Sequence, residues 1–368
     1  MNKKLLLLSL QKSGGGAIDT LGLSNGLCAN KIFHYLIISS DNELAERFID
    51  NEFRKVYKIK TFKTSLLDFF IQTFIYCRFL RLIKIILNIK PDFIFVTHFN
   101  PWVSFVYLLK IFLKNKILYG IHDNPYDPKE KQKPFSIFLE KIFLKYADLI
   151  ITYSNYIEKD IKRFIKSKKF LTIYLGTYKD LFPDYRKNFN IEKKELTLLF
   201  FGRILPYKGL DILLKAYENL RKKNLKIKLI IAGRGEVEKK VKEKIIDLGV
   251  IFKNHWISND ELLEILEESD VIVIPYKKGT QSAIISLGLA CGFPIIASNV
   301  GSFSEFIIDG ENGFLFESNN YLELAEKIEY LYFNRERLKK MGEASFKKGE
   351  EFSWQNTVKS LIKFLNEE

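Results

Sequence analysis

Short apolar runs alternate with amphipathic stretches along most of the chain. The runs are rich in Leu, Ile, Val and Phe and alternate little with polar residues, which is typical of strands buried on both faces of a parallel sheet. We expect strands at Leu5–Leu10, Tyr35–Ser39, Phe93–Thr97, Ile117–Ile121, Leu149–Thr152, Phe170–Tyr174, Leu196–Phe201, Lys228–Ala232, Val250–Phe252, Val271–Pro275, Pro294–Ala297 and Gly313–Phe316.

Between these runs, apolar residues recur at helical spacing. Clear amphipathic helices are expected at Tyr207–Lys222, Glu236–Leu248, Asn259–Glu268 and Tyr321–Tyr330. Alternation of strands and helices predicts βα units, and so an α/β fold with parallel sheets. The pattern falls into two similar halves, and 368 residues is long for one hydrophobic core, so we expect two domains.

The boundary between the domains is expected in Pro183–Lys194, a polar stretch with neither a helical nor a strand period. We therefore assign residues 1–187 to a first domain and 188–350 to a second. Residues 351–368 carry apolar side chains at helical spacing after Ser353, a residue type that caps helices. A final helix is expected there.

The segment Ser65–Leu87 is mostly apolar, but Arg78, Arg81 and Lys84 form a basic stripe along it. Three basic residues within the segment disfavour a transmembrane helix. The stripe is compatible with a helix in a membrane interface, where basic residues meet anionic headgroups. It is also compatible with a helix that packs on the first sheet and shows one basic face to water, which is the interpretation that we favour.

The cysteines and the amino terminus indicate a reducing, cytoplasmic setting. Cys28, Cys77 and Cys291 are odd in number and far apart, which favours neither a disulfide framework nor a metal site. The run Leu5–Leu8 is short and soon followed by polar residues, so we interpret it as a buried strand rather than an export signal.

The net charge of +14 is confined to the first half of the chain. Residues 1–187 contain 31 Lys and Arg against 17 Asp and Glu, whereas the remainder contains 27 of each. Such asymmetry predicts that the first domain meets an anionic partner, such as phospholipid headgroups or a phosphorylated acceptor. Nucleic acid is not expected, because the basic residues are scattered among apolar helices without an RNA- or DNA-binding motif.

The strongest chemical signal is the segment Leu199–Asp211, which places a strand, Gly202, Arg203, a proline-containing loop, Lys208 and the start of a helix in succession. Ligands bind at the carboxyl ends of strands in doubly wound sheets. There two cations and free backbone N–H groups suit a diphosphate. We predict a donor-phosphate site centred on Arg203 and Lys208.

From this segment onward the chain resembles the family 4 glycosyltransferases, which have the GT-B fold of two Rossmann-like doubly wound domains facing a central cleft. The resemblance covers most of the second half and only loosely the first. It rests on these further segments, in family order: Ile230–Glu236, Val271–Tyr276, Ala290–Ala297, Val300–Glu305 and Asp309–Leu315. It implies that Arg234 and Trp256 lie near the nucleoside, that Glu305 belongs to the donor site, and that the final helix crosses back to the first domain.

The paired glutamates that are the commonest mark of the family are absent, since Gly279 and Leu287 stand at those positions. The sequence instead resembles a branch of the family with a Thr-Gln-Ser segment, here Thr280-Gln281-Ser282. Ser282 is expected to cap a helix whose first N–H groups face the donor phosphates. The contacts to sugar and ribose that the glutamates usually make cannot be carried over.

In the first half, glycines and histidines follow predicted strands. Gly15 and Gly16, in the stretch that begins at Gly14, suit a loop under the donor diphosphate or at the acceptor. The family often has a histidine near the transferred sugar, and His122 is our candidate for it. A neutral imidazole could hydrogen-bond the sugar or position the acceptor hydroxyl. His98 is a rival candidate.

The resemblance implies a retaining glycosyltransferase that uses a nucleotide diphospho-sugar and a glycan or lipid-linked glycan acceptor. We expect no cofactor and no catalytic metal, since neither an Asp-x-Asp pair nor a His/Cys cluster is evident. Surface polysaccharide or lipopolysaccharide synthesis at the inner face of a bacterial plasma membrane fits the basic first half. Two alternatives stay open: a GT-B nucleotide-sugar epimerase and a non-catalytic GT-B partner protein.

Overall fold

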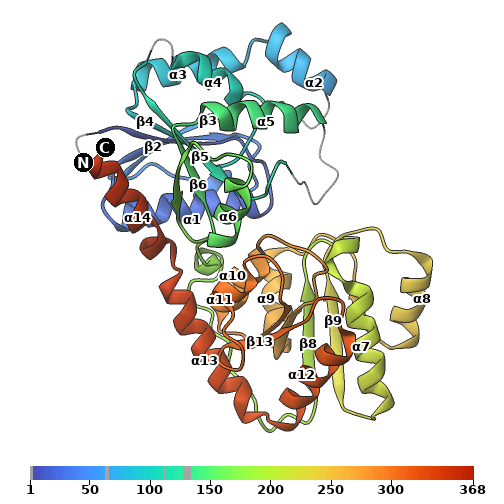
Figure 1. Ribbon diagram of the computed structural model, residues 1–368. Coiled ribbons are helices and arrows are strands. Elements are labelled where there is room, and N and C mark those ends of the chain that lie inside the picture. Colours follow the sequence, from blue (N-terminus) through green and yellow to red (C-terminus); the bar gives the residue numbers. More distant parts are fainter. Residues whose placement is uncertain (1–2, 63–65, 111–112, 127–133) are drawn as a thin grey trace. The chain divides into compact units, whose positions relative to one another are not determined.

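The computed structural model describes residues 3–62, 66–110, 113–126 and 134–368. It divides into two compact units, the first made of residues 1–176 and 352–368 and the second of residues 177–351. Each contains a wholly parallel sheet between helices (Figure 1). The expected α/β class is confirmed.

The first unit is built on a seven-stranded sheet in the order β3-β2-β1-β4-β5-β6-β7. Its strands are β1 (Leu5–Ser9), β2 (His34–Ser39), β3 (Arg54–Ile59), β4 (Phe93–Val96), β5 (Lys116–Ile121), β6 (Leu149–Thr152) and β7 (Lys169–Thr172). The strand order reverses between β1 and β4. The loops after these two strands therefore turn to opposite sides of the sheet and leave room for a ligand between them.

Helices cover both faces of this sheet. They are α1 (Gly15–Ala29), α2 (Leu66–Phe70), a π-helical turn η2 (Ile71–Ile75), α3 (Phe79–Ile89), α4 (Val103–Leu109), α5 (Pro134–Tyr146), α6 (Asn155–Lys162) and α14 (Trp354–Glu367), with a short 3₁₀ turn η1 (Ala45–Arg47). α3, α4 and α5 lie together on one face, and α1 and α14 lie on the other (Figure 1). Burial on both faces explains why the strands read as continuous apolar runs.

The second unit has a six-stranded sheet in the order β10-β9-β8-β11-β12-β13. Its strands are β8 (Leu196–Phe201), β9 (Ile227–Ala232), β10 (Ile251–Lys253), β11 (Val271–Ile274), β12 (Ile295–Ser298) and β13 (Gly313–Phe316). Its helices are η3 (Tyr178–Asp180), η4 (Pro206–Lys208), α7 (Leu210–Lys222), α8 (Lys239–Asp247), α9 (Asn259–Glu268), α10 (Ala283–Cys291), α11 (Phe303–Phe306), α12 (Tyr321–Phe333) and α13 (Glu336–Glu351). Here the order reverses between β8 and β11.

Every predicted strand is present, with its ends shifted by at most two residues. The sequence pattern missed β3, because Arg54, Lys55 and Lys58 interrupt its apolar positions. β3 is an edge strand, paired only with β2, so its side chains can stay polar where an inner strand could not.

The apolar segment Ser65–Leu87 forms α2 with η2 and then most of α3, and Ser65 itself lies outside the described residues. In α3, Leu82, Ile86 and Ile89 are buried against the sheet while Arg81 and Lys84 are exposed. The packed-helix interpretation is therefore correct for α3. Within the described ranges, no helix combines the length and the apolar character needed to cross a bilayer.

The boundary between the units lies after Gly176 rather than after residue 187. The segment 177–187 belongs to the second unit because it bonds there. The Lys187 N–H donates to the Cys291 carbonyl at 2.8 Å, and the Lys187 ammonium donates to the Glu267 carbonyl at 2.6 Å. The chain returns to the first unit at Phe352, after α13.

The final helix α14 is fastened to the first unit through Trp354. A Cβ added at Gly22 or at Gly176 would come within 2.2 Å of the Trp354 indole, and one at Gly26 would lie 2.6 Å from the Trp354 carbonyl. Three glycines thus form a notch that only a residue without a side chain can line. Asn30 adds a hydrogen bond of 2.8 Å to the Gln355 carbonyl.

We expect Trp354→Ala to destabilise the protein by about 3–5 kcal/mol, because it empties the glycine notch of a buried indole. Urea unfolding followed by circular dichroism measures the loss. The matched control is Trp256→Ala, whose indole is 63% exposed and which should change stability by no more than about 0.5 kcal/mol. Equal midpoints for the two variants would show that the notch contributes little.

Candidate functional site

Two groups of predicted site residues lie at the carboxyl edges of the two sheets, one in each unit. In the second unit, Gly202 follows β8 with φ 113°, and its N–H donates to the Ala232 carbonyl at 3.0 Å. A Cβ at Gly202 would lie 3.5 Å from the Ile284 side chain, so this turn faces the first turn of α10. The next residue, Arg203, is exposed.

Lys208 ends η4 and is bound to Tyr276, which follows β11. The Lys208 ammonium donates a hydrogen bond to the Tyr276 hydroxyl and lies 4.1 Å from the ring centroid. The Tyr276 hydroxyl is 3.2 Å from the Ser282 hydroxyl. A chain of polar contacts therefore links the loop after β8 to the loop after β11, across the point where the strand order reverses.

Ser282 caps α10, as the sequence predicted. Its hydroxyl accepts a hydrogen bond from the Ile284 N–H at 3.3 Å. The remaining N–H groups of the first turn carry the positive end of the helix dipole. With Arg203 and Lys208, this edge of the sheet combines two cations with a helix amino terminus, which is the chemistry that holds phosphate.

The Thr280-Gln281 stretch is held in place by α11. The Ser302 hydroxyl and N–H donate to the Thr280 carbonyl at 2.7 and 2.9 Å. A Cβ at Gly301 would lie 2.2 Å from the Gly279 carbonyl oxygen, so the two backbones approach closely. Glu305 is half-buried and lies in α11, the helix that begins directly after Ser302.

The predicted nucleoside-side residues follow the next two strands. The Arg234 carbonyl accepts from the Ile204 N–H at 2.9 Å, and the Arg234 side chain is exposed. Trp256 is also exposed, beyond β10. Its neighbour His255 hydrogen-bonds Glu261 at 2.9 Å. Both side chains lie in loops at the carboxyl edge of the second sheet and are accessible to a ligand.

In the first unit, the rivals His98 and His122 come together. Their rings stack with centroids 4.0 Å apart, and His122 stacks in turn on Tyr153 at 4.2 Å. Asp19 of α1 lies beneath them, with its carboxylate 3.9 Å from His98 Nε2 and 3.8 Å from His122 Nδ1. These residues are far apart in sequence and meet because β4, β5 and β6 are neighbours in the sheet.

Burial keeps both imidazoles neutral. It lowers the pKa of His122 to about 4, although a hydrogen bond with the Thr97 backbone opposes the shift. It also lowers the pKa of His98 well below its ordinary value, and the neighbouring His122 adds to the effect. Burial raises the pKa of Tyr153 well above 10. Neutral rings can accept or donate one hydrogen bond each without carrying charge to a ligand.

The sequence analysis saw no His/Cys cluster, yet Asp19, His98 and His122 offer ligand types that suit a transition metal. Their geometry does not fit one. The two ring planes are only 16° from parallel and stacked, so their nitrogen lone pairs do not point to a common centre. The carboxylate–nitrogen distances also exceed the spacing of about 3.4 Å between ligands of a tetrahedral zinc.

Gly15 and Gly16 begin α1 directly after the turn at Gly14, whose φ is 78°. A Cβ at Gly16 would lie 2.8 Å from His98 Nε2. The glycine therefore admits the stacked histidines to the edge of the sheet, a role that spacing alone did not reveal.

Three residues of these sites were not identified from the sequence. Asp19 is the sole charged residue of α1, which was a usable signal. Tyr153 and Tyr276 each follow a strand, but tyrosine is common in this chain, so their positions carried no distinctive signal. Their contacts depend on which strands become neighbours.

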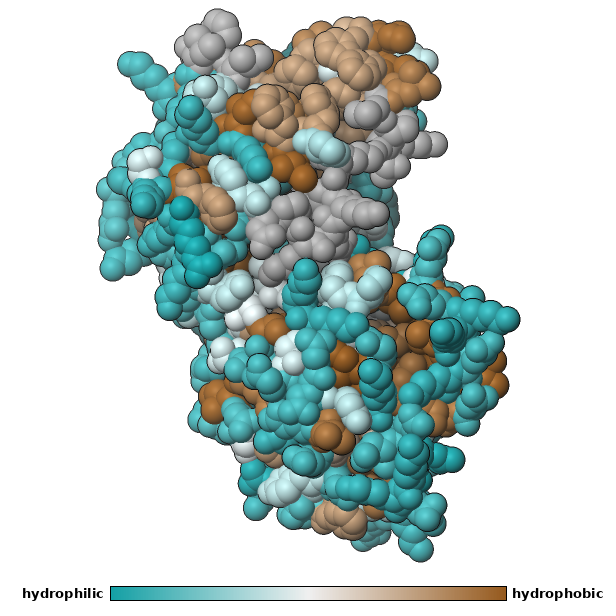
Figure 2. All heavy atoms as spheres, turned by 45° about the vertical axis from the view of Figure 1, so that its right-hand side comes forward, coloured by the Kyte–Doolittle hydropathy of each residue, from teal (hydrophilic) through white to brown (hydrophobic). Residues whose placement is uncertain are grey.

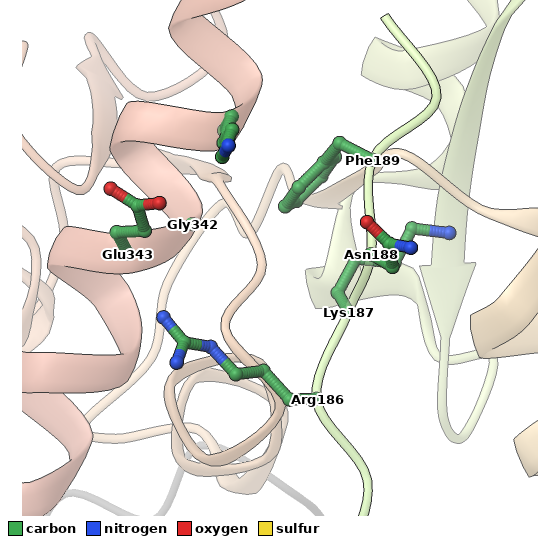
Figure 3. A pocket seen from close by; sticks show the side chains of 7 residues that line it. Arg186, Lys187, Asn188, Phe189, Gly342 and Glu343 are labelled. Atoms are coloured by element: carbon green, nitrogen blue, oxygen red, sulfur yellow. The ribbon is translucent and has the colours of Figure 1, made fainter.

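A separate cavity of about 310 Å³ lies elsewhere in the second unit, between the segment before β8 and α13 (Figure 3). The Phe189 and Arg186 side chains point toward α13, and a Cβ at Gly342 would lie 2.5 Å from the Phe189 ring. The cavity is near the amino ends of the strands, on the opposite edge from Arg203, where doubly wound folds do not place ligands. It is lined by Arg186, Lys187, Asn188, Phe189, Lys339, Gly342 and Glu343.

Family models cover nearly the whole chain. Residues 13–179 match the model described as Glycosyltransferase Family 4, and residues 182–348 match Glycosyl transferases group 1. An uncharacterised glycosyltransferase of Methanocaldococcus jannaschii is 32% identical over 234 residues, which cover 62% of this chain and 63% of that protein. The lipopolysaccharide 1,2-N-acetylglucosaminetransferase of Salmonella typhimurium is 26% identical over 47% of this chain and 49% of its own length. Both alignments thus span less than two thirds of the relative.

Solved structures share the fold over the full length. Sucrose-phosphate synthase from Thermosynechococcus elongatus has a TM-score of 0.77 at 16% identity, over 100% of this chain and 99% of that one. Anabaena HepE in complex with UDP-glucose has a TM-score of 0.72 at 16% identity, over 100% of both chains. At such low identity these likenesses establish the GT-B fold alone.

The half-buried His122 makes stability sensitive to acid. Its folded pKa of about 4 lies below the ordinary value of 6.5, so the unfolded chain takes up the proton first as the pH falls. The stability contributed by the neutral ring is complete above pH 6.5 and is lost toward pH 4. Between pH 7 and pH 5, we expect the free energy of unfolding to fall by roughly 2 kcal/mol more in the parent protein than in the His122→Asn variant. Parallel curves of unfolding free energy against pH would contradict a buried neutral His122.

Proposed function

Because the chain belongs to the family 4 group 1 glycosyltransferases, we propose that it is a retaining glycosyltransferase that takes its sugar from a nucleotide diphospho-sugar. The observation that carries the proposal is the grouping of Arg203, Lys208 and the amino terminus of α10 at the reversal point of the second sheet. HepE, solved with UDP-glucose on the same fold, supports a nucleotide sugar as the donor.

The chemistry follows from the leaving group. As the glycosidic bond breaks, the nucleoside diphosphate gains negative charge on the oxygen that leaves. Arg203, Lys208 and the N–H groups of α10 would stabilise that charge, which is electrostatic catalysis. Tyr276 holds the Lys208 ammonium in place, so little side-chain freedom is lost when the phosphates bind. We propose that no metal ion is needed at this diphosphate.

The other donor contacts are assigned by position. Arg234 and Trp256 would lie beside the nucleoside, and the Trp256 indole offers a face for stacking on a base. Gly202 would let the backbone approach the phosphates. Thr280, Gln281 and Glu305, on loops fastened to each other, would contact ribose or sugar in place of the missing glutamates.

In the first unit, His122 with Gly15 and Gly16 would bind the transferred sugar or the acceptor. The neutral imidazole suits a hydrogen bond to a sugar hydroxyl and adds no charge that would compete for the diphosphate. Asp19 and Tyr153 keep the His122 ring in its place.

For the acceptor, we propose a glycan or lipid-linked glycan of bacterial surface polysaccharide or lipopolysaccharide, reached from the cytoplasmic face of the membrane. The named activity of the Salmonella relative supports this pathway. The excess of basic residues, all within residues 1–187, supports a partner with phosphate groups.

A thermal-shift panel of UDP-, GDP-, ADP- and dTDP-sugars tests the donor site. At 100 times its dissociation constant, the correct donor stabilises the folded protein by about 2.7 kcal/mol. We expect one of the four to raise the unfolding midpoint, and Arg203→Ala combined with Lys208→Ala to abolish the rise.

The matched control is Lys215→Ala combined with Arg221→Ala, two exposed basic residues on α7 that should leave the rise unchanged. Stabilisation by none of the four sugars would count against the proposed donor. A rise that survives the Arg203 and Lys208 substitutions would move the site elsewhere.

A further inference from the structure

The short helix α2 and the π-helical turn η2 present apolar side chains on both sides. One side faces the core: Phe69 is buried, and the buried Thr73 hydroxyl accepts a hydrogen bond from the Trp102 indole N–H at 2.7 Å. The other side faces outward, where Leu67 is 72% exposed and Ile75 is 71% exposed. The helix is therefore anchored firmly while its outer face stays apolar, unlike the polar outer face of an ordinary surface helix.

The neighbouring α5 adds a second row of exposed apolar side chains. Phe135, Phe138, Ile142 and Tyr146 follow one another at three- and four-residue spacing, which places them on one side of the helix. The two helices are in contact, since the Phe69 and Phe135 ring centroids are 6.4 Å apart, so the exposed rows on them are neighbours. Figure 2 shows apolar side chains gathered at this end of the first unit.

We define the apolar surface as the exposed side chains of these two rows. It consists of Leu67, Phe70, Phe74, Ile75, Tyr76, Phe135, Phe138, Ile142 and Tyr146. Scattered exposed apolar residues are normal on proteins, but a joined surface of this kind marks an interaction site. Six of its members are Phe or Tyr, and aromatic rings favour the interface between lipid and water.

Basic residues accompany the apolar surface. Arg81 and Lys84 are exposed on α3, which follows η2 directly, and Lys145 is exposed on α5. Within α2, η2, α3 and α5, these residues and Lys141 outnumber the acids, which are Asp68 and Glu140. The charge presented around the surface is therefore positive.

We infer that this apolar surface inserts into the headgroup region of an anionic bilayer, with Arg81, Lys84 and Lys145 meeting the lipid phosphates. Apolar insertion combined with basic residues at the same face is the pattern of interfacial membrane binding. A second copy of this chain fits less well, because it would bring the same positive charges against each other. The basic stripe of α3 thus supplies charge only, and α2, η2 and α5 supply the inserted side chains.

Cosedimentation with phosphatidylcholine vesicles, with and without about 30 per cent of the anionic lipid phosphatidylglycerol, tests the inference. We expect the protein to bind the anionic vesicles. The variant Phe74→Ser, Ile75→Ser, Phe138→Ser should bind them at least about tenfold more weakly, since three exposed side chains no longer insert. Arg81→Gln with Lys84→Gln should reduce the preference for anionic over neutral vesicles.

The matched control is Ile246→Ser, Leu322→Ser, Phe333→Ser, which removes equally exposed apolar side chains from the second unit and should bind like the parent. Failure of the parent protein to bind anionic vesicles would overturn the inference, as would parental binding by the Phe74 variant. Concentration-dependent dimerisation that the Phe74 variant abolishes, without vesicle binding, would assign the surface to a second copy instead. The inference rests on the proposed function only for the lipid-linked acceptor. Donor-induced thermal shifts are measured in parallel, so that a failure of membrane binding can be distinguished from a failure of the proposed transferase function.

Discussion

The parallel pairing of strands is the constraint on which the rest of this structure depends. Parallel neighbours require a crossover connection, so each sheet is covered by helices on both faces and its strands are apolar throughout. All carboxyl ends then lie at one edge of the sheet. Where the strand order reverses, between β1 and β4 and between β8 and β11, the loops diverge and leave the edge open. Both groups of candidate site residues lie at such an edge.

The two edges are electrostatically different, and the difference suits separate tasks. At the second sheet, cations and a helix amino terminus are held by Tyr276 and Ser282, so positive charge is concentrated where a diphosphate would bind. At the first sheet, burial makes His98 and His122 neutral, so they can recognise hydroxyl groups without charge. A leaving group that gains charge and a sugar that carries none call for these opposite solutions.

The Thr280–Ser282 segment has a defined structure without the family's paired glutamates. Ser282 keeps α10 capped, and Ser302 fixes the Thr280 carbonyl, so the loop has a defined shape without a carboxylate. In the proposed donor site, phosphate binding would depend on backbone geometry and on Arg203 and Lys208, which are present. Sugar recognition would depend on particular side chains, and those at the glutamate positions differ here. The proposed phosphate site is therefore better defined in this chain than the identity of the sugar.

The sequence by itself determined the elements whose signal is local. Apolar runs determined the strands, and Ser282 determined a helix cap, while the donor-phosphate role of the Gly202–Lys208 pattern stays a prediction. It failed at β3, an edge strand free to be polar, and at the unit boundary, which follows the bonds of Lys187 rather than composition. Only the tertiary structure decided which distant residues meet. The stacking of His98 on His122, the bond from Lys208 to Tyr276 and the apolar surface of α2, η2 and α5 all depend on strand order and helix packing, and no spacing along the chain encodes these.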